Sequence, residues 1–161
     1  MARRILGIDP GSAATGWALV VADGNRFRLE DAAVFRPRGA TREVRLAALA
    51  GQLDDLLARL VPDAAAVETP FTGRNPSSAL RLAETRGVIL SRLGVSAVAV
   101  HAYSPAAVKL AVVGTGNADK RQVVYMVVRL LALERPLPQD AADAAAVALT
   151  HLHSTRWLDR R

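Results

Sequence analysis

The first 35 residues alternate between short apolar runs and turn-forming segments, a pattern typical of β-strands. Strands are predicted at 4–9, 15–22 and 27–35. The segments between them, PGS at 10–12 and DGN at 23–25, have the composition of tight turns. Three adjacent strands joined by short turns predict an antiparallel meander.

From residue 41 onward, the spacing of apolar residues changes from that of a strand to that of a helix. Leucine and valine recur at three- and four-residue steps between 41 and 60, and Pro62 ends this helix. The short apolar run at 64–68 indicates a buried strand. Because it follows a helix, we expect a crossover connection and a parallel neighbour.

Two capping signals mark the starts of later helices. Asn75-Pro76 and Ser104-Pro105 each place a capping side chain directly before a proline, which favours the first helical position. The helix after Asn75 is expected to run to about residue 93 with Gly87 inside it. Because a glycine in mid-helix costs about 1 kcal/mol, we expect another element to pack closely there. A fifth strand is predicted at 96–102, and further helices at 118–133 and 139–153.

This order of elements predicts an α/β protein with a mixed five-stranded sheet flanked by helices on both faces. At 161 residues, of which 51% are hydrophobic, the chain has the size and the core material of one domain. We expect that domain to span 1–154, and 155–161 to form a short basic tail.

Composition excludes several classes of protein. The chain has no cysteine, which excludes disulfides, zinc–thiolate sites and thiol catalysis. No apolar run approaches the ~18 residues of a membrane span, and the N-terminal apolar stretch is too short for a signal peptide. We therefore expect a soluble, cytoplasmic protein.

Four acidic residues interrupt apolar segments that would normally carry no charge. Asp9 and Glu68 each end a predicted buried strand, and Asp140 and Asp143 lie three apart in an alanine-rich helix. The carboxyl ends of parallel strands meet at the ligand-binding edge of an α/β sheet, and residues three apart share a helix face. Since one buried, unpaired carboxylate costs several kcal/mol, we expect the four to meet around a divalent cation, which prefers oxygen ligands.

The net charge points to a polyanionic substrate. The chain carries +6, and without those four acids its 21 basic and 11 remaining acidic residues give +10. A basic body around an acidic pocket suits a polyanion delivered to metal ions, although a solvated basic surface with no partner is the alternative.

The chain has 19 arginines but only two lysines, Lys109 and Lys120. A compact ammonium suits contact with a single phosphate, although two residues are also compatible with chance.

Each fragment has a simpler interpretation when it is taken alone. Asp9 and the turn after it could simply end a strand. They could also open the phosphate loop of actin-like ATPases and sugar kinases, but those proteins have two such domains and this chain has room for one. Glu68 could end a strand in solvent, and Asp140 could be a helix N-terminal acid. Phe71 could be a core residue or an aromatic that stacks on an unpaired base. The histidines have no metal-binding spacing and are expected to be structural or solvated.

Together, motifs spread from about residue 4 to about residue 153 resemble the RuvC-type Holliday-junction resolvases. The motifs occur in the family's order and at similar spacing. They are GIDPG at 7–11, TG at 15–16, VE at 67–68 with Phe71 and Asn75, AETRG at 83–87, VVGTG at 112–116 with Lys120, and DAADA at 140–144.

The resemblance implies a ribonuclease H-like fold and a homodimer that nicks four-way DNA junctions in recombination and repair, alongside a branch-migration complex of RuvA- and RuvB-type proteins. It implies Mg²⁺ as cofactor, with Mn²⁺ as a possible substitute, and two-metal phosphodiester hydrolysis that leaves 5′-phosphate and 3′-hydroxyl ends. The implied metal ligands are Asp9, Glu68, Asp140 and Asp143, with Lys120 also catalytic. The implied DNA-binding residues are Phe71, Arg74, Asn75, Lys109 and Lys120.

Two other functions remain open from the sequence. One is a different ribonuclease H-like nuclease that acts on RNA, and the other is a non-catalytic module that binds branched DNA. The four intact acids argue against the second.

The dimer is expected to use the helix after Asn75, where Ala79, Ala83 and Gly87 form a stripe of small residues. The alternative is that this stripe packs inside the monomer.

Overall fold

The computed structural model describes residues 2–69 and 75–158, and its elements follow the order predicted from the sequence. They are β1 (Arg3–Asp9), β2 (Thr15–Asp23), β3 (Arg26–Phe35), α1 (Arg42–Leu60), β4 (Ala64–Glu68), α2 (Pro76–Val95), β5 (Ala99–Tyr103), α3 (Pro105–Val113), α4 (Lys120–Leu130) and α5 (Gln139–Leu158). Among the described residues, no helix combines the length and apolar character needed to cross a bilayer.

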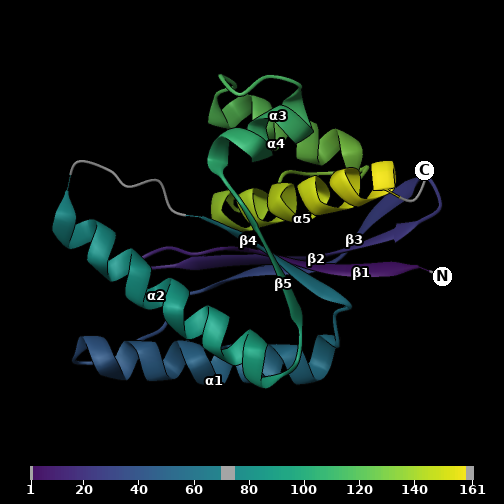
Figure 1. Cartoon of the computed structure of the whole chain (residues 1–161). Coiled ribbons are helices and arrows are strands. Elements are labelled where there is room, and N and C mark those ends of the chain that lie inside the picture. Colours follow the sequence, from purple (N-terminus) through teal and green to yellow (C-terminus); the bar gives the residue numbers. More distant parts are fainter. Residues whose placement is uncertain (1, 70–74, 159–161) are drawn as a thin grey trace.

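The five strands form one mixed sheet in the order β3-β2-β1-β4-β5. The pairs β1–β2 and β2–β3 are antiparallel, whereas β1–β4 and β4–β5 are parallel. Figure 1 shows α1 and α2 on one face of the sheet and α3, α4 and α5 on the other. The mixed sheet with helices on both faces is thus confirmed, and β1 lies at its centre.

The two faces of the sheet differ in side-chain size. Because successive residues of a strand point to opposite faces, Leu6 and Leu19 pack with the leucines of α1. Ala18 and Ala66 pack instead with α5. Large side chains therefore separate the sheet from α1 and α2, while small ones allow α5 to come close.

The approach of α5 to the sheet is close enough to require glycine at two strand positions. A Cβ at Gly7 would collide with the backbone carbonyl of Ala144, and a Cβ at Gly16 would collide with that of Asp140. Ala141 and Ala144 on α5 are fully buried. The helix backbone thus lies directly against β1 and β2, and its first turn is held beside the end of β1.

Three expectations from the sequence are wrong in detail. The fifth strand was expected at 96–102 but spans Ala99–Tyr103, because α2 continues to Val95 and the chain turns at Ala97, whose φ is 54°. The last helix was expected to end at about residue 153 but continues to Leu158, because no proline or glycine follows residue 139 to end it before that point. No described atom lies within 4 Å of a Cβ built on Gly87, so the close packing expected there does not occur within the described chain. Both Ala83 and Gly87 are exposed, which places this part of the stripe outside the monomer core.

We expect Gly7→Ala to destabilise the protein by about 1–3 kcal/mol, because the added methyl group overpacks the contact with α5. Each kcal/mol corresponds to roughly 2–4 °C in Tm for a chain of this size. Thermal unfolding followed by circular dichroism measures the change. The control is Gly51→Ala in α1, where no described atom lies within 4 Å of the new Cβ and where Tm should stay level or rise slightly. A Gly7→Ala protein as stable as the wild type would contradict the close contact.

Candidate active site

Asp9 and Glu68 meet because they end neighbouring parallel strands and point to the same face of the sheet. In the parallel pairing of the two strands, Ile8 of β1 lies opposite Val67 of β4, one residue before each acid. By the alternation of strand side chains, Asp9 shares a face with Gly7 and points toward α5. Glu68 shares that face through Ala66, which packs in the same core cluster as α5.

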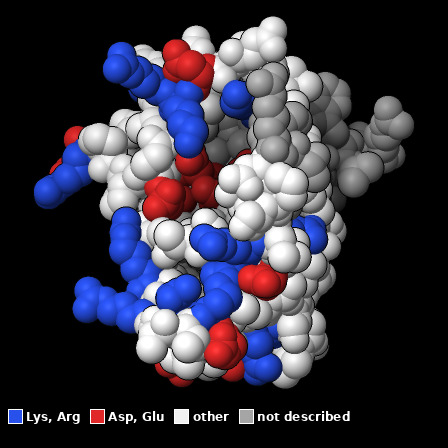
Figure 2. Space-filling view, turned by 90° about the vertical axis from the view of Figure 1, so that its left-hand side faces the viewer, with Lys and Arg blue, Asp and Glu red and all other residues white. Residues whose placement is uncertain are grey.

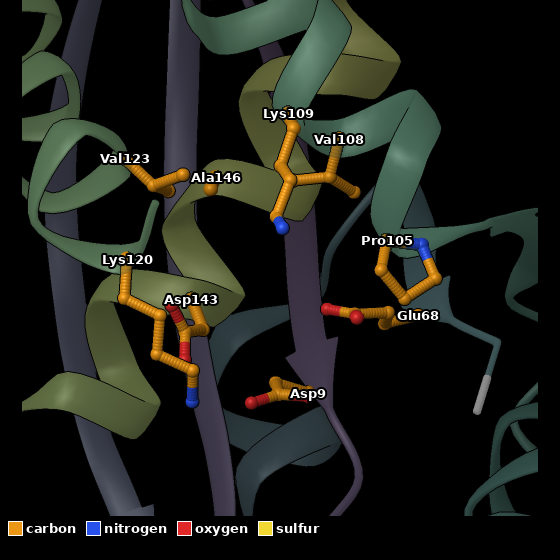
Figure 3. Close-up of a pocket in the computed structure, with 9 residues that line it drawn as sticks. All are labelled: Asp9, Glu68, Pro105, Val108, Lys109, Lys120, Val123, Asp143 and Ala146. Carbon is orange, nitrogen blue, oxygen red and sulfur yellow. The ribbon is translucent and has the colours of Figure 1, made fainter. Parts of the chain in front are cut away.

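The first two turns of α5 bring the other two acids to this edge of the sheet. Asp143 lines the same pocket as Asp9 and Glu68, and Figure 3 shows its carboxylate on the pocket side of the helix. Asp140 does not line the pocket but lies near enough to raise the pKa of Asp9. One of its oxygens is 3.9 Å from a guanidinium nitrogen of Arg36. All four predicted acids therefore come from three separate segments, β1, β4 and α5, to one edge of the sheet.

The pocket has a volume of about 260 Å³ and combines acidic, basic and apolar walls. Figure 2 shows acidic side chains at the bottom of a hollow, with Lys and Arg side chains around it. This matches the basic body around an acidic pocket that the sequence predicts. The lining residues are Asp9, Glu68, Pro105, Val108, Lys109, Lys120, Val123, Asp143 and Ala146.

Burial and mutual repulsion make the acids of the pocket hard to ionise. Burial is the main cause that raises the pKa of Asp9 to about 8, and repulsion by Glu68, Asp143 and Asp140 adds to it. Burial followed by repulsion from Asp143 raises the pKa of Glu68 to about 7. The pKa of Asp143 is also raised, chiefly by burial. A positive charge in the pocket would therefore favour the ionised forms.

The carboxylates of Asp9 and Glu68 have the character of ligands for a hard cation. No residue in the described ranges donates a hydrogen bond to either of them, and none forms an ion pair with them within 4.0 Å. Partly buried oxygens without donors, close to further carboxylates, suit a divalent cation in chemistry and in charge. Among the described residues, however, no three His, Asp or Glu side chains lie close enough to hold one ion as they stand. If a metal ion binds here, at least one of these side chains would have to rotate toward the others.

Both lysines of the chain point into the pocket, as Figure 3 shows. Lys120 begins α4, which a capping box fixes: Gln122 N–H donates to the Asp119 carboxylate, and Asp119 N–H donates to Oε1 of Gln122. Lys109 lies on α3. The charge of Lys120 lowers the pKa of the three pocket acids, and that of Lys109 lowers the pKa of Glu68. Both lysines therefore lie within electrostatic reach of the carboxylates.

The remaining predicted DNA contacts are not brought to the pocket by the described structure. Phe71 and Arg74 lie outside the described residues. Asn75 caps α2, since its Oδ1 accepts hydrogen bonds from the backbone N–H groups of Ser77 and Ser78 at 3.0 and 3.4 Å. A contact of any of these three residues with DNA stays a prediction.

Two residues near the acids were missed from the sequence. Gln139 donates a hydrogen bond from Nε2 to Oδ1 of Asp143 at 2.9 Å, and its four-residue spacing from that acid on a helix was an available signal. Arg36 approaches Asp140 from the end of β3. Nothing in the sequence links those two residues, because only the fold brings them together.

The histidines have structural contacts away from the pocket. The Tyr103 hydroxyl lies 2.8 Å from Nδ1 of the buried His151. The ring of His101 lies beside that of His151, with centroids 4.3 Å apart. Nδ1 of His153 lies 3.1 Å from the carbonyl oxygen of Ala111. These contacts agree with the structural role expected for His151 and His153.

Comparison with known proteins identifies the family. The family model described as crossover junction endodeoxyribonuclease RuvC matches residues 5–151. The RuvC of Chloroflexus aggregans is 45% identical over 159 residues, which cover 98% of this chain and 97% of that protein. The structure of Thermus thermophilus RuvC matches with a TM-score of 0.87 at 33% identity, covering 98% of this chain and 96% of that one. The structure of T. thermophilus RuvC in complex with Holliday junction substrate matches with a TM-score of 0.90 at 32% identity, covering 96% of both chains.

The likeness to T. thermophilus RuvC spans the whole mixed sheet and its helices. It confirms the ribonuclease H-like fold that the sequence motifs imply, and together with the family match it leads to one assignment. The chain belongs to the RuvC family of crossover junction endodeoxyribonucleases.

Proposed function

We propose that this RuvC protein resolves four-way DNA (Holliday) junctions by paired, symmetric nicks in recombination and repair. The observation that carries the proposal is the pocket in which Asp9, Glu68 and Asp143 face Lys109 and Lys120. The family is one of DNA-junction endonucleases, and one matching structure is a RuvC in complex with a Holliday junction. An RNA-directed nuclease and a non-catalytic module have no comparable support.

The metal we propose is Mg²⁺, with two ions per site and Mn²⁺ able to substitute. Asp9, Glu68 and Asp143 would hold it together with Asp140, because their oxygens are the only acidic donors at this edge of the sheet in the described chain. Bound Mg²⁺ supplies an activated water and neutralises charge at the phosphate. The acids would contribute by releasing their protons, with Asp9 and Glu68 turning toward Asp143. The products would carry 5′-phosphate and 3′-hydroxyl ends.

The lysines are proposed to hold the DNA phosphates. Lys120 points into the space between the acids and would contact the scissile phosphate, where an ammonium can stabilise developing negative charge. Lys109, on α3, would hold the same or a neighbouring phosphate. Each is a compact charge that can adapt to a phosphate oxygen without the fixed planar geometry of arginine.

A two-fold homodimer would supply the second nick. Each chain has one acid cluster, whereas a junction with near two-fold symmetry needs two matched cuts, and a closed dimer presents two identical sites. The outer side of α2 supports its use as the interface: Ala83 and Gly87 are exposed, and Leu80 is 63% exposed. We further propose that the enzyme works in the cytoplasm on junctions supplied by a branch-migration complex of RuvA- and RuvB-type proteins.

Asp9→Asn should abolish nicking yet stabilise the metal-free protein. We expect the nicking rate with Mg²⁺ to fall by at least about 100-fold, since even changes around metal ligands cost 10- to 100-fold. Junction binding should persist, because it depends on the basic surface. A carboxyl group whose pKa is raised from 3.8 to about 8 destabilises the fold progressively as pH rises through that range. In EDTA, the variant should therefore melt higher than the wild type at pH 9, by several degrees, and by less at pH 6.

The control for this experiment is Asp55→Asn, which changes an exposed acid of α1 and should alter neither nicking nor the pH dependence of Tm. Nicking at the wild-type rate by Asp9→Asn would remove this residue from the mechanism. A Tm difference in EDTA that is the same at both pH values would contradict the raised pKa as its cause.

Lys120→Ala should slow nicking without unfolding the protein. We expect a loss of roughly 10²–10³-fold, the usual effect of removing one group that stabilises transition-state charge. The Tm should stay within a few degrees, because the side chain is exposed and acts on the acids only through its charge. Single-turnover nicking of a labelled junction measures the rate, and Arg26→Ala at the distant β2–β3 hairpin is the control. Full activity of Lys120→Arg would show that a compact ammonium is not required.

A further inference from the structure

Gln139, the first residue of α5, reaches one helical turn along the helix to Asp143. Its Nε2 donates to Oδ1 of that acid at 2.9 Å. Of the three carboxylates that line the pocket, Asp143 is the only one that accepts a hydrogen bond from a residue in the described ranges. Gln139 therefore restrains the Asp143 carboxylate, whereas no described residue donates a hydrogen bond to Asp9 or Glu68.

This hydrogen bond opposes a repulsion that would otherwise turn Asp143 away. The charge of Asp143 raises the pKa of Asp9 and of Glu68, and the charge of Asp140 raises the pKa of Asp143. A free side chain beside like charges would rotate toward solvent. Because Gln139 occupies one oxygen, the carboxylate is kept on the pocket side of α5, where Figure 3 shows it, and the other oxygen stays available.

An amide suits this position because it orients the carboxylate without adding charge. The pocket already has two ammonium groups, Lys109 and Lys120. A further cation on Asp143 would neutralise the carboxylate and compete with a metal ion for it. A neutral donor leaves the full negative charge for the ion, which is how residues behind metal ligands usually act.

We propose that Gln139 is a positioning residue that holds the Asp143 carboxylate on the pocket side of α5, so that metal binding requires only Asp9 and Glu68 to turn toward it. This role depends on the proposed function, in which Asp143 is a metal ligand. The simpler interpretation is an exposed helical pair at four-residue spacing, which contributes only slightly to helix stability. The two interpretations differ in metal affinity, which a contact that serves only the helix would leave unchanged.

The test compares Gln139→Leu, which keeps a side chain of similar volume but loses the donor, with Gln139→Ala. Gln52→Leu on the exposed side of α1 is the matched control. Mn²⁺ binding to the DNA-free protein is measured by electron paramagnetic resonance, and the Mg²⁺ concentration for half-maximal nicking is measured in parallel. We expect both Gln139 variants to bind Mn²⁺ about 10-fold more weakly and to need correspondingly more Mg²⁺. Their Tm in EDTA and the affinity of the control for Mn²⁺ should match the wild type.

Mn²⁺ affinity within twofold of wild type in both Gln139 variants would overturn the proposal, and so would a lowered Tm in EDTA with unchanged affinity. If the wild type itself bound no Mn²⁺, the proposed metal site would fail and this role of Gln139 with it. Normal binding by the wild type with unaffected variants would overturn the role of Gln139 alone.

Discussion

The active site depends on direct contact between the backbone of α5 and strands β1 and β2 of the sheet. Gly7 and Gly16 leave room for the carbonyls of Ala144 and Asp140, so no side chain separates helix from strand at these points. A helix resting on larger side chains would hold its first turns farther from the sheet. The acids of α5 would then lie away from the end of β1. Small residues on one face of the sheet therefore set how close the acids of α5 come to Asp9 and Glu68.

The same contact places acids that are hard to ionise next to the fully buried side chains of α5. Asp9 and Glu68 have pKa values raised to about 8 and about 7 because burial and like charges disfavour their ionised forms. The fully buried alanines and leucines of α5 can offset that cost. Lys120 relieves part of it without forming a close ion pair. Such destabilised acids are typical of sites that hold a cation or titrate in function.

The sequence predicted the elements, and the acidic cluster followed from physical rules that need no coordinates. Strand alternation and helical spacing are local, and Asp9 and Glu68 were conspicuous as charges at the ends of apolar strands. The details that failed depend on tertiary approach or on rotamers. Gly87 was expected to be packed, yet no described neighbour reaches it. The hydrogen bond of Gln139 depends on a side-chain rotamer, and the importance of Gly7 appears only once α5 is placed on the sheet.

The central claim is that Asp9, Glu68 and Asp143 form one metal site at the end of the sheet. A crystal structure of the protein soaked in Mn²⁺, with data collected at the manganese absorption edge, tests it most directly. We expect an anomalous peak in the pocket with oxygens of these three carboxylates about 2.0–2.4 Å away, the range for oxygen ligands of such cations, reached by side-chain rotation while α5 stays in place. A peak elsewhere, or no peak with the acids still apart, would contradict this account.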